Sequence, residues 1–245
     1  MSNTKAAIVP FRPTPRMPKA DLRKQDWIGR DLSHANFEGA DLSGSLLMRT
    51  DLSGANLMGA NLSGCVLTGA NLEGALLKDA NLQGAVLSRT NLKDAYLVGA
   101  DFTGANTFQM NLRGADLEGV DLSGFELVSA NLRDANLGKA NLVGVDLGDA
   151  CLVNANLREA DLSRALLSHA NLRDVNLREA DLTGANLTGA NLQGAILLET
   201  ILKDSILLNC RWRDCLIASD LTVASIPPRR RELEFAEVAL LGKIP

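Results

Sequence analysis

Histidine and cysteine are the side chains best suited to acid–base, nucleophilic or metal chemistry near neutral pH, and this chain has few of them. Its 245 residues include two histidines, His34 and His169, with no cysteine or serine arrangement around them. The four cysteines lack the paired spacing of a zinc site or a disulfide framework; they are Cys65, Cys151, Cys210 and Cys215. We therefore predict no catalytic residue, no metal site and no cofactor, and we expect that the protein is not an enzyme. Unpaired cysteines also favour a reducing compartment, and we expect a cytoplasmic protein.

Carboxylates are abundant, and some of them recur at multiples of twenty residues. We call the following set the acidic face: Asp41, Asp101, Asp121, Asp161 and Asp181. Such a ladder of carboxylates could imitate the phosphates of a nucleic acid. The alternative is that Asp is simply the ordinary solvated residue of a repeated unit. Which interpretation applies depends on the structural element that positions these residues.

That element is a unit of five residues. From Ala20 the chain reads ADLRK-QDWIG-RDLSH-ANFEG-ADLSG, and the register holds without insertion to about Ile217, which makes forty units. The third residue of the unit is Leu in 34 of the forty, and the first is Ala in 25. A period of five fits neither an α-helix nor a β-strand, so the chain must turn once per unit.

The tandem A-[D/N]-L-x-x pattern resembles the pentapeptide-repeat family. The resemblance implies an all-β fold, a right-handed quadrilateral parallel β-helix (solenoid) with four units per coil and about ten coils. It also implies that the Leu and the preceding Ala point inward, while the other three positions point outward. A narrow tube accepts one large and one small side chain per face, which explains why Leu and Ala alternate.

Glycine marks the corners of the expected solenoid. Of the 21 glycines, 18 occupy the fifth position of the unit, where the second central residue of a type II turn needs a positive φ. Between residues 129 and 179 only Gly144 remains at that position, and the others are mainly charged. Because such residues resist a positive φ, we predict a different turn type in this stretch. Its alternating charges indicate a solvated surface, with a docking site as the minority interpretation.

Outward apolar residues follow two opposite faces. We call the first set the apolar stripe: Leu46, Met48, Val66, Val86, Phe108 and Val128, with Leu166 beyond them. The opposite face has Met58, Leu76, Tyr96 and Val98, and near its end Ile196, Leu198 and Leu216. Apolar side chains spaced one coil apart can form a protein interface. Scattered exposed apolar residues are also ordinary, so the stripe alone does not decide the question.

One internal defect interrupts the repeat at Asn106–Met110. Thr107 occupies an inward Leu position, and Phe125 replaces the small inward residue of the same face one coil later. We expect Phe125 and Met110 to fill the space that Thr107 leaves. A bulge that turns Phe108 outward toward a partner is the alternative.

The two ends differ from the repeat. Residues 1–19 form a basic, proline-rich segment that we expect to be an extended tail. The solenoid is predicted over residues 20–219, where Trp27 and Trp212 replace Leu in the terminal coils and could plug the open ends. Residues 220–245 are predicted to form a linker and a helix from Glu232 to Leu241, just before Gly242. That helix would cap the last coil or form a homodimer through its apolar residues, which are Leu233, Phe235, Ala236, Leu240 and Leu241.

Charge limits the kind of partner. The formal net charge is −4, but residues 1–19 contribute four positive charges and residues 222–245 a net positive charge of one, which leaves −9 for residues 20–221. A negative rod disfavours direct nucleic-acid binding and favours a partner with a basic groove. No apolar run reaches the ~18 residues that cross a bilayer, so we expect no membrane partner.

These observations predict a non-enzymatic scaffold that presents rigid faces to a protein partner. The alternative is implied by the family resemblance, because some members mimic DNA and protect DNA gyrase or topoisomerase IV, type II topoisomerases, from antibiotics or toxins. That alternative predicts a dominant acidic face and a dimer through the C-terminal helix. The absence of any insertion in forty units counts against it, because gyrase-protecting members often carry loops that project from the rod.

Overall fold

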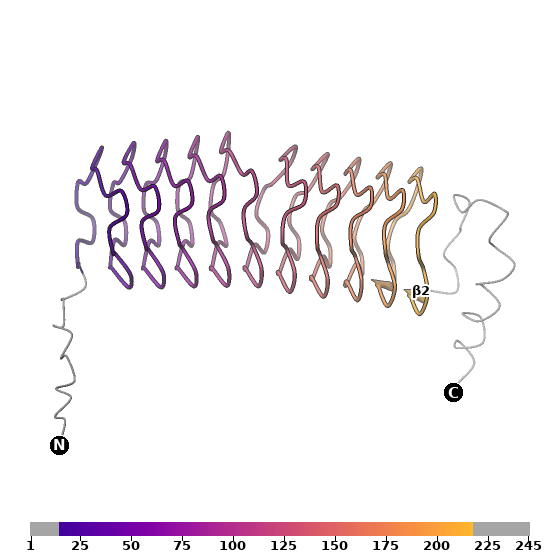
Figure 1. Cartoon of the computed structure of the whole chain (residues 1–245). Helices are drawn as coiled ribbons and strands as arrows, with labels where there is room; N and C mark the ends of the chain where they lie inside the picture. The colour runs from indigo at the N-terminus through magenta and orange to yellow at the C-terminus, as the bar shows by residue number, and fades with distance from the viewer. Residues whose placement is uncertain (1–14, 218–245) are drawn as a thin grey trace, which may run out of the picture.

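The described part of the chain, residues 15–217 of a computed structural model, is a rod of stacked coils (Figure 1). Each coil has twenty residues, and parallel bridges join most outward second residues of the units to the residue twenty positions later, as in Asp31 to Asp51 and Leu46 to Val66. Two strands are long enough to be assigned, β1 (Ile196–Leu197) and β2 (Leu216–Ile217), and they pair in parallel with Ile196 opposite Leu216. No helix occurs between residues 15 and 217. This confirms the all-β solenoid.

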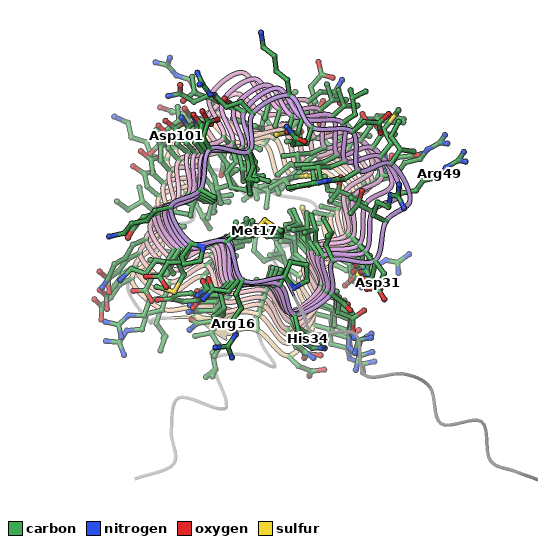
Figure 2. All side chains as sticks on the ribbon, turned by 90° about the vertical axis from the view of Figure 1, so that its left-hand side faces the viewer. Arg16, Met17, Asp31, His34, Arg49 and Asp101 are labelled. Atoms are coloured by element: carbon green, nitrogen blue, oxygen red, sulfur yellow. The ribbon has the colours of Figure 1, made fainter. Side chains whose placement is uncertain are left out.

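Viewed along its axis, the rod has a four-sided cross-section (Figure 2). Met17 points into the tube, whereas Arg16, Asp31 and Arg49 point away from it. The third residues of the units, nearly all Leu, form a continuous core with the small first residues, and most of both sets are fully buried. Trp27 closes the first coil from inside, where its ring stacks on Phe37 with centroids 5.5 Å apart. Trp212 packs in a similar half-buried position in the last complete coil.

Every corner uses the same turn. The N–H of each unit's first residue donates to the carbonyl three residues earlier, for example Ala35 to Leu32 at 3.1 Å, except at Gln25, whose N–H donates to Ser45 Oγ at 3.0 Å. The fifth residue of each unit lies in the turn with a positive φ, as in a type II turn. Between residues 129 and 179 the non-glycine residues at this position have φ of 56–61°.

The prediction of a different turn type in that stretch is therefore wrong. The left-handed conformation costs a non-glycine residue about 1–2 kcal/mol. The ladder bonds on both sides of each corner, together with the buried Leu, hold the backbone in place against that cost.

Residues 15–19, which precede the predicted start of the solenoid at residue 20, already pair with the coil that follows. Met17 N–H donates to the carbonyl of Asn36 at 2.8 Å, and Asn36 N–H donates back to the carbonyl of Pro15 at 2.8 Å. Pro18 stands at the first central position of the turn from Met17 to Ala20, where its fixed φ is favourable. Residues 15–19 are thus the first face of the rod, although their prolines indicate an extended tail.

Candidate interaction surfaces

The carboxylates of the acidic face have a structural role in their own turns. Asp41 Oδ1 accepts a hydrogen bond from the backbone N–H of Ser43 at 3.0 Å, and Asp181 accepts one from Thr183 at 2.8 Å. The equivalent bond occurs at the other three members of the set, Asp101, Asp121 and Asp161. The bond from the Ser43 backbone holds the pKa of Asp41 below its usual value, and the Thr103 hydroxyl and backbone do the same for Asp101.

Asparagine makes the same bond without a charge. Asn136 Oδ1 accepts from the N–H of Gly138 at 3.2 Å, while its amide nitrogen donates to Asp116 Oδ1 one coil earlier at 2.9 Å. Asn156 then donates to Asn136 at 2.9 Å, which extends the ladder. The turn therefore selects Asp or Asn at this position whatever the charge. The sequence pattern shows this preference, but the hydrogen bond behind it was not predicted.

The apolar stripe consists of two separate pieces. Leu46, Val66 and Val86 form one column through consecutive parallel bridges. The column ends at Asn106, and Glu126 and Asp146 occupy the next two positions on the same face before Leu166. The other piece is Phe108 and Val128, which are 55% and 42% exposed and stand in successive coils at a different position of the unit.

The opposite face is dominated by charges between residues 118 and 199. Arg158 pairs with Glu159 of its own coil at 3.2 Å and with Glu179 of the next at 3.3 Å. Arg178 repeats the arrangement with Glu179 at 3.0 Å and Glu199 at 3.3 Å. These pairs are largely solvent-exposed and each contributes little to stability, so they form a mixed-charge surface.

Three of the four faces of the last complete coil carry exposed apolar residues, of which only Leu216 was noted from the sequence. Four of its neighbouring outward residues are about half exposed: Ile201, Ile206, Leu208 and Leu216. The available signal was the second position of the unit, which is Asp or Asn in most of the rod but Ile196, Ile201 and Ile206 at this end. The predicted cap or dimer residues Leu233, Phe235, Ala236, Leu240 and Leu241, and the helix that contains them, lie outside the described residues.

A cleft opens in the middle of the rod where the ladder between two coils is interrupted. Residues 75–94 make twelve inter-coil backbone hydrogen bonds with residues 95–114. Residues 95–114 make only four with residues 115–134, involving Leu97, Asp116, Leu112 and Gly114 as donors. Across the rest of this junction, from Gly99 to Met110, no backbone bond to the next coil forms. The coils visibly separate there (Figure 1).

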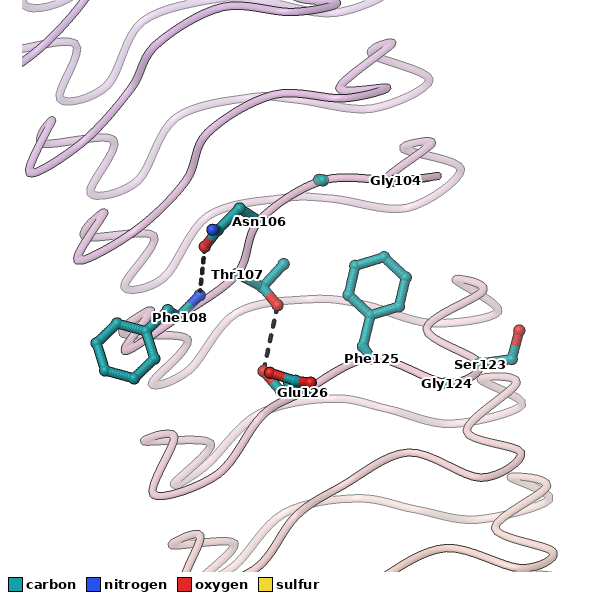
Figure 3. A pocket seen from close by; sticks show the side chains of 9 residues that line it. Gly104, Asn106, Thr107, Phe108, Ser123, Gly124, Phe125 and Glu126 are labelled. Atoms are coloured by element: carbon teal, nitrogen blue, oxygen red, sulfur yellow. Dashed lines mark hydrogen bonds between the residues drawn. The ribbon is translucent and has the colours of Figure 1, made fainter.

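Side chains at the cleft show why the coils separate (Figure 3). Phe125 stands where other units have Ala, and its ring points into the space between the coils, toward the segment of Thr107. It is half-buried against the core, and Met110 is fully buried, as expected of residues that fill the space left by Thr107. The coils nevertheless do not close. Thr107 Oγ donates across the gap to the carbonyl of Glu126 at 3.3 Å, in place of a backbone bond.

The cleft has a volume of about 620 Å³. Its lining runs along both coils: Gly104, Ala105, Asn106, Thr107 and Phe108 on one side, and Ser123, Gly124, Phe125 and Glu126 on the other.

A model of pentapeptide repeats matches eight copies along residues 19–211. The chain belongs to the pentapeptide-repeat family. The matched segments end at residue 106 and resume at 111, so the unmatched residues 107–110 coincide with the edge of the cleft.

Several solved pentapeptide-repeat proteins are similar to this chain. HetL, involved in heterocyst differentiation regulation in the cyanobacterium Nostoc sp. strain PCC 7120, is 33% identical over 83% of this chain and 87% of its own, with a TM-score of 0.39. Rfr23 from the cyanobacterium Cyanothece 51142 is 35% identical over 43% of this chain and 89% of its own, with a TM-score of 0.38. Full-length QnrB1, a plasmid-mediated fluoroquinolone resistance protein, is 18% identical over 80% and 92%, with a TM-score of 0.33. A comparison with curated proteins finds no match.

Three cysteine side chains of this pentapeptide-repeat protein, Cys65, Cys210 and Cys215, are buried in the solenoid. Residues 15–217 have no group of His, Cys, Asp and Glu side chains placed to hold a metal ion, and no helix suited to crossing a membrane. Burial raises the pKa of the Cys65 thiol to about 11 and that of Cys210 to about 12. Each donates to a backbone carbonyl instead, Cys65 to Leu42 at 3.1 Å. These thiols stay protonated at neutral pH and serve as small core residues.

Proposed function

We propose that this pentapeptide-repeat protein is a non-enzymatic scaffold that holds a protein partner on its outward faces. The observation that carries the proposal is the column of Leu46, Val66 and Val86, with Met48 beside it. Leu46 is 38% exposed, and the bridges between successive coils hold the three side chains in register. A pre-ordered apolar column loses little conformational entropy when a partner covers it.

The test is a triple substitution, Leu46→Asp, Val66→Asp and Val86→Asp, in the full-length protein used as bait. Aspartate already occupies this position of the same face at Asp26 and Asp146, so the fold should tolerate the change. The control adds the same charge to the neighbouring face through Asn61→Asp, Asn81→Asp and Asn141→Asp. We expect a partner that the native protein and the control retain and the stripe variant loses. Equal retention by all three proteins would contradict the proposal.

A second candidate function, protection of DNA gyrase or topoisomerase IV by mimicry of DNA, depends on the acidic face and the net negative charge of the rod. It is the second candidate because the charge density of the rod is lower than that of DNA. A net charge of −9 over ten coils about 4.8 Å apart is roughly one charge per 5 Å, against one per ~1.7 Å in duplex DNA.

The same variants separate the two functions. If the acidic face mimics DNA, the control with three added aspartates should protect gyrase against a fluoroquinolone more strongly than the native protein does. The stripe variant should then be as protective as the native protein. No effect of any of the three proteins on supercoiling or on drug-induced cleavage would remove this candidate.

A further inference from the structure

The cleft presents two edges of unpaired backbone. On its N-terminal side the N–H groups of Phe102, Gly104 and Thr107 make no hydrogen bond to the described residues, although the equivalent groups of the preceding coil donate to the next coil. On the other side the N–H groups of Asp121 and Glu126 are likewise without a partner there. Elsewhere in the rod these same positions form the parallel ladder.

An open edge of this kind favours an extended chain. Backbone donors and acceptors left without partners carry a free-energy cost, and a strand that adds to a sheet edge satisfies them. The volume of about 620 Å³ is within the ~300–1,000 Å³ typical of ligand sites. The Phe125 ring provides an apolar surface inside the cleft, and Phe108, 55% exposed, provides another at its rim.

The negative charge around the cleft favours basic peptides over acidic ones. Its lining contains Glu126 and neither Lys nor Arg, and Asp101 and Asp121 stand on the two coils beside it. In an intact junction these two positions are bridged directly, whereas here no bridge joins them. Asp101 accepts a hydrogen bond from Gln83 on its other side, at 2.6 Å, and neither Asp101 nor Asp121 forms an ion pair with a residue of the described part of the chain.

We propose that the cleft binds a short, basic, proline-free segment of a partner protein in extended conformation, as a strand added between the two coils. The backbone of the segment would accept from the unpaired N–H groups of Phe102 and Gly104 on one side and of Asp121 and Glu126 on the other. One apolar side chain would pack against Phe125, and flanking Lys or Arg side chains would face Asp101 and Asp121. The inference deepens the proposed scaffold function but uses a different surface from the apolar stripe.

The experiment uses the full-length protein and a fluorescein-labelled, amide-capped probe of sequence Lys-Thr-Val-Arg-Val-Thr-Lys, with fluorescence anisotropy as readout. We expect saturable binding that disappears when alternate backbone amides along one edge of the probe are N-methylated, since methylation removes the donors that pair with a strand. A probe with Glu in place of Lys and Arg should not bind. Equal binding of the N-methylated probe, or no saturable binding of the unmodified probe, would overturn the proposal.

Two protein variants locate the site. The pair Asp101→Asn and Asp121→Asn keeps the turn bonds, because Asn occupies this position in other coils, and should weaken binding of the basic probe about five- to tenfold at low salt. The pair Thr107→Leu and Phe125→Ala restores the repeat and should abolish binding. The stripe variant with Asp at positions 46, 66 and 86 should bind the probe like the native protein, which separates this proposal from the scaffold test. Unchanged affinity in both cleft variants would overturn the proposal.

Discussion

Two neighbouring junctions of the same rod have different strengths. Between residues 75–94 and 95–114 all twelve backbone bonds form, whereas between residues 95–114 and 115–134 only four do. The sequences at the two junctions have the same period and nearly the same composition. The coil of residues 95–114, with Thr107 in place of Leu, belongs to both junctions, and the second junction differs by Phe125 in place of Ala in the coil that follows.

The comparison shows that core packing controls the ladder in a solenoid. Each ladder bond contributes about 0.5–1.5 kcal/mol net, and the bonds of one corner form or fail together because rigid coils separate as units. A ring at an Ala position requires more room than the spacing between coils allows, and overpacking is relieved by moving backbone. The cleft is the result.

The largest effect should come from a core deletion in an intact coil. Leu147 is fully buried, and Leu147→Ala should lower the free energy of unfolding by about 2–5 kcal/mol through lost burial and the cavity left behind. Thr107→Ala at the cleft should cost about 1 kcal/mol, because the surrounding coils are already apart. Urea unfolding of both variants measures the difference, and equal losses would contradict a weakened junction.

Restoring the repeat should strengthen the weak junction. Thr107→Leu with Phe125→Ala should raise the free energy of unfolding by about 3 kcal/mol, as new ladder bonds and a buried Leu outweigh the lost ring. The single change Phe125→Ala should not destabilise the protein if the ring holds the coils apart, whereas it should destabilise by about 3 kcal/mol or more if Phe125 only fills a void. Thermal unfolding followed by circular dichroism distinguishes the two outcomes by their sign.

The hydrogen bonds that Asn side chains make between successive coils should also be worth less beside the cleft than in intact coils, but by a smaller free energy. Asn136 bonds to its own turn and to both neighbouring coils, so Asn136→Ala should cost about 1–2 kcal/mol. Asn106, beside the cleft, bonds only to Ser88 and the N–H of Phe108, and its replacement by Ala should cost less than about 1 kcal/mol. A larger loss at Asn106 than at Asn136 would contradict a weakened junction between residues 95–114 and 115–134.

The smallest effect concerns the turns between residues 129 and 179. Gly144 has φ of +64° and open space around it, so Gly144→Ala should cost about 1 kcal/mol from backbone strain alone. The reverse change, Arg164→Gly at φ of +58°, should have an effect of similar size but opposite sign. If both changes are neutral, the left-handed conformation carries no cost here, and the turns were mispredicted for a reason other than strain.

Much of the fold could be predicted from the repeat, because inward Leu and Ala and a glycine at every corner leave the chain few alternatives. Two features of the fold were not predicted. Lys19 and its neighbours join the first coil because Pro18 suits the turn, although proline suggested a tail. Charged residues such as Glu159 accept a positive φ because the ladder imposes it.

At the candidate site, Thr107 and Phe125 were recognised as a defect from the sequence alone. The opening of the cleft was not predicted, because it depends on whether the Phe125 side chain repacks or the backbone hydrogen bonds between the coils break. A pattern of residue types does not give the relative free energies of side-chain packing and backbone hydrogen bonding, because both depend on the spacing between the coils.

Hydrogen exchange of the backbone amides in the free full-length protein tests the central claim most directly. The amides of Leu82, Leu87 and Arg89 donate to the next coil at 2.8, 2.7 and 2.8 Å, and we predict slow exchange for them. The amides of Phe102, Thr107 and Gln109 occupy the same positions one coil later without such bonds, and we predict fast exchange. Equal protection of the two sets would show that the ladder is continuous in solution and would contradict both the cleft and the function inferred from it.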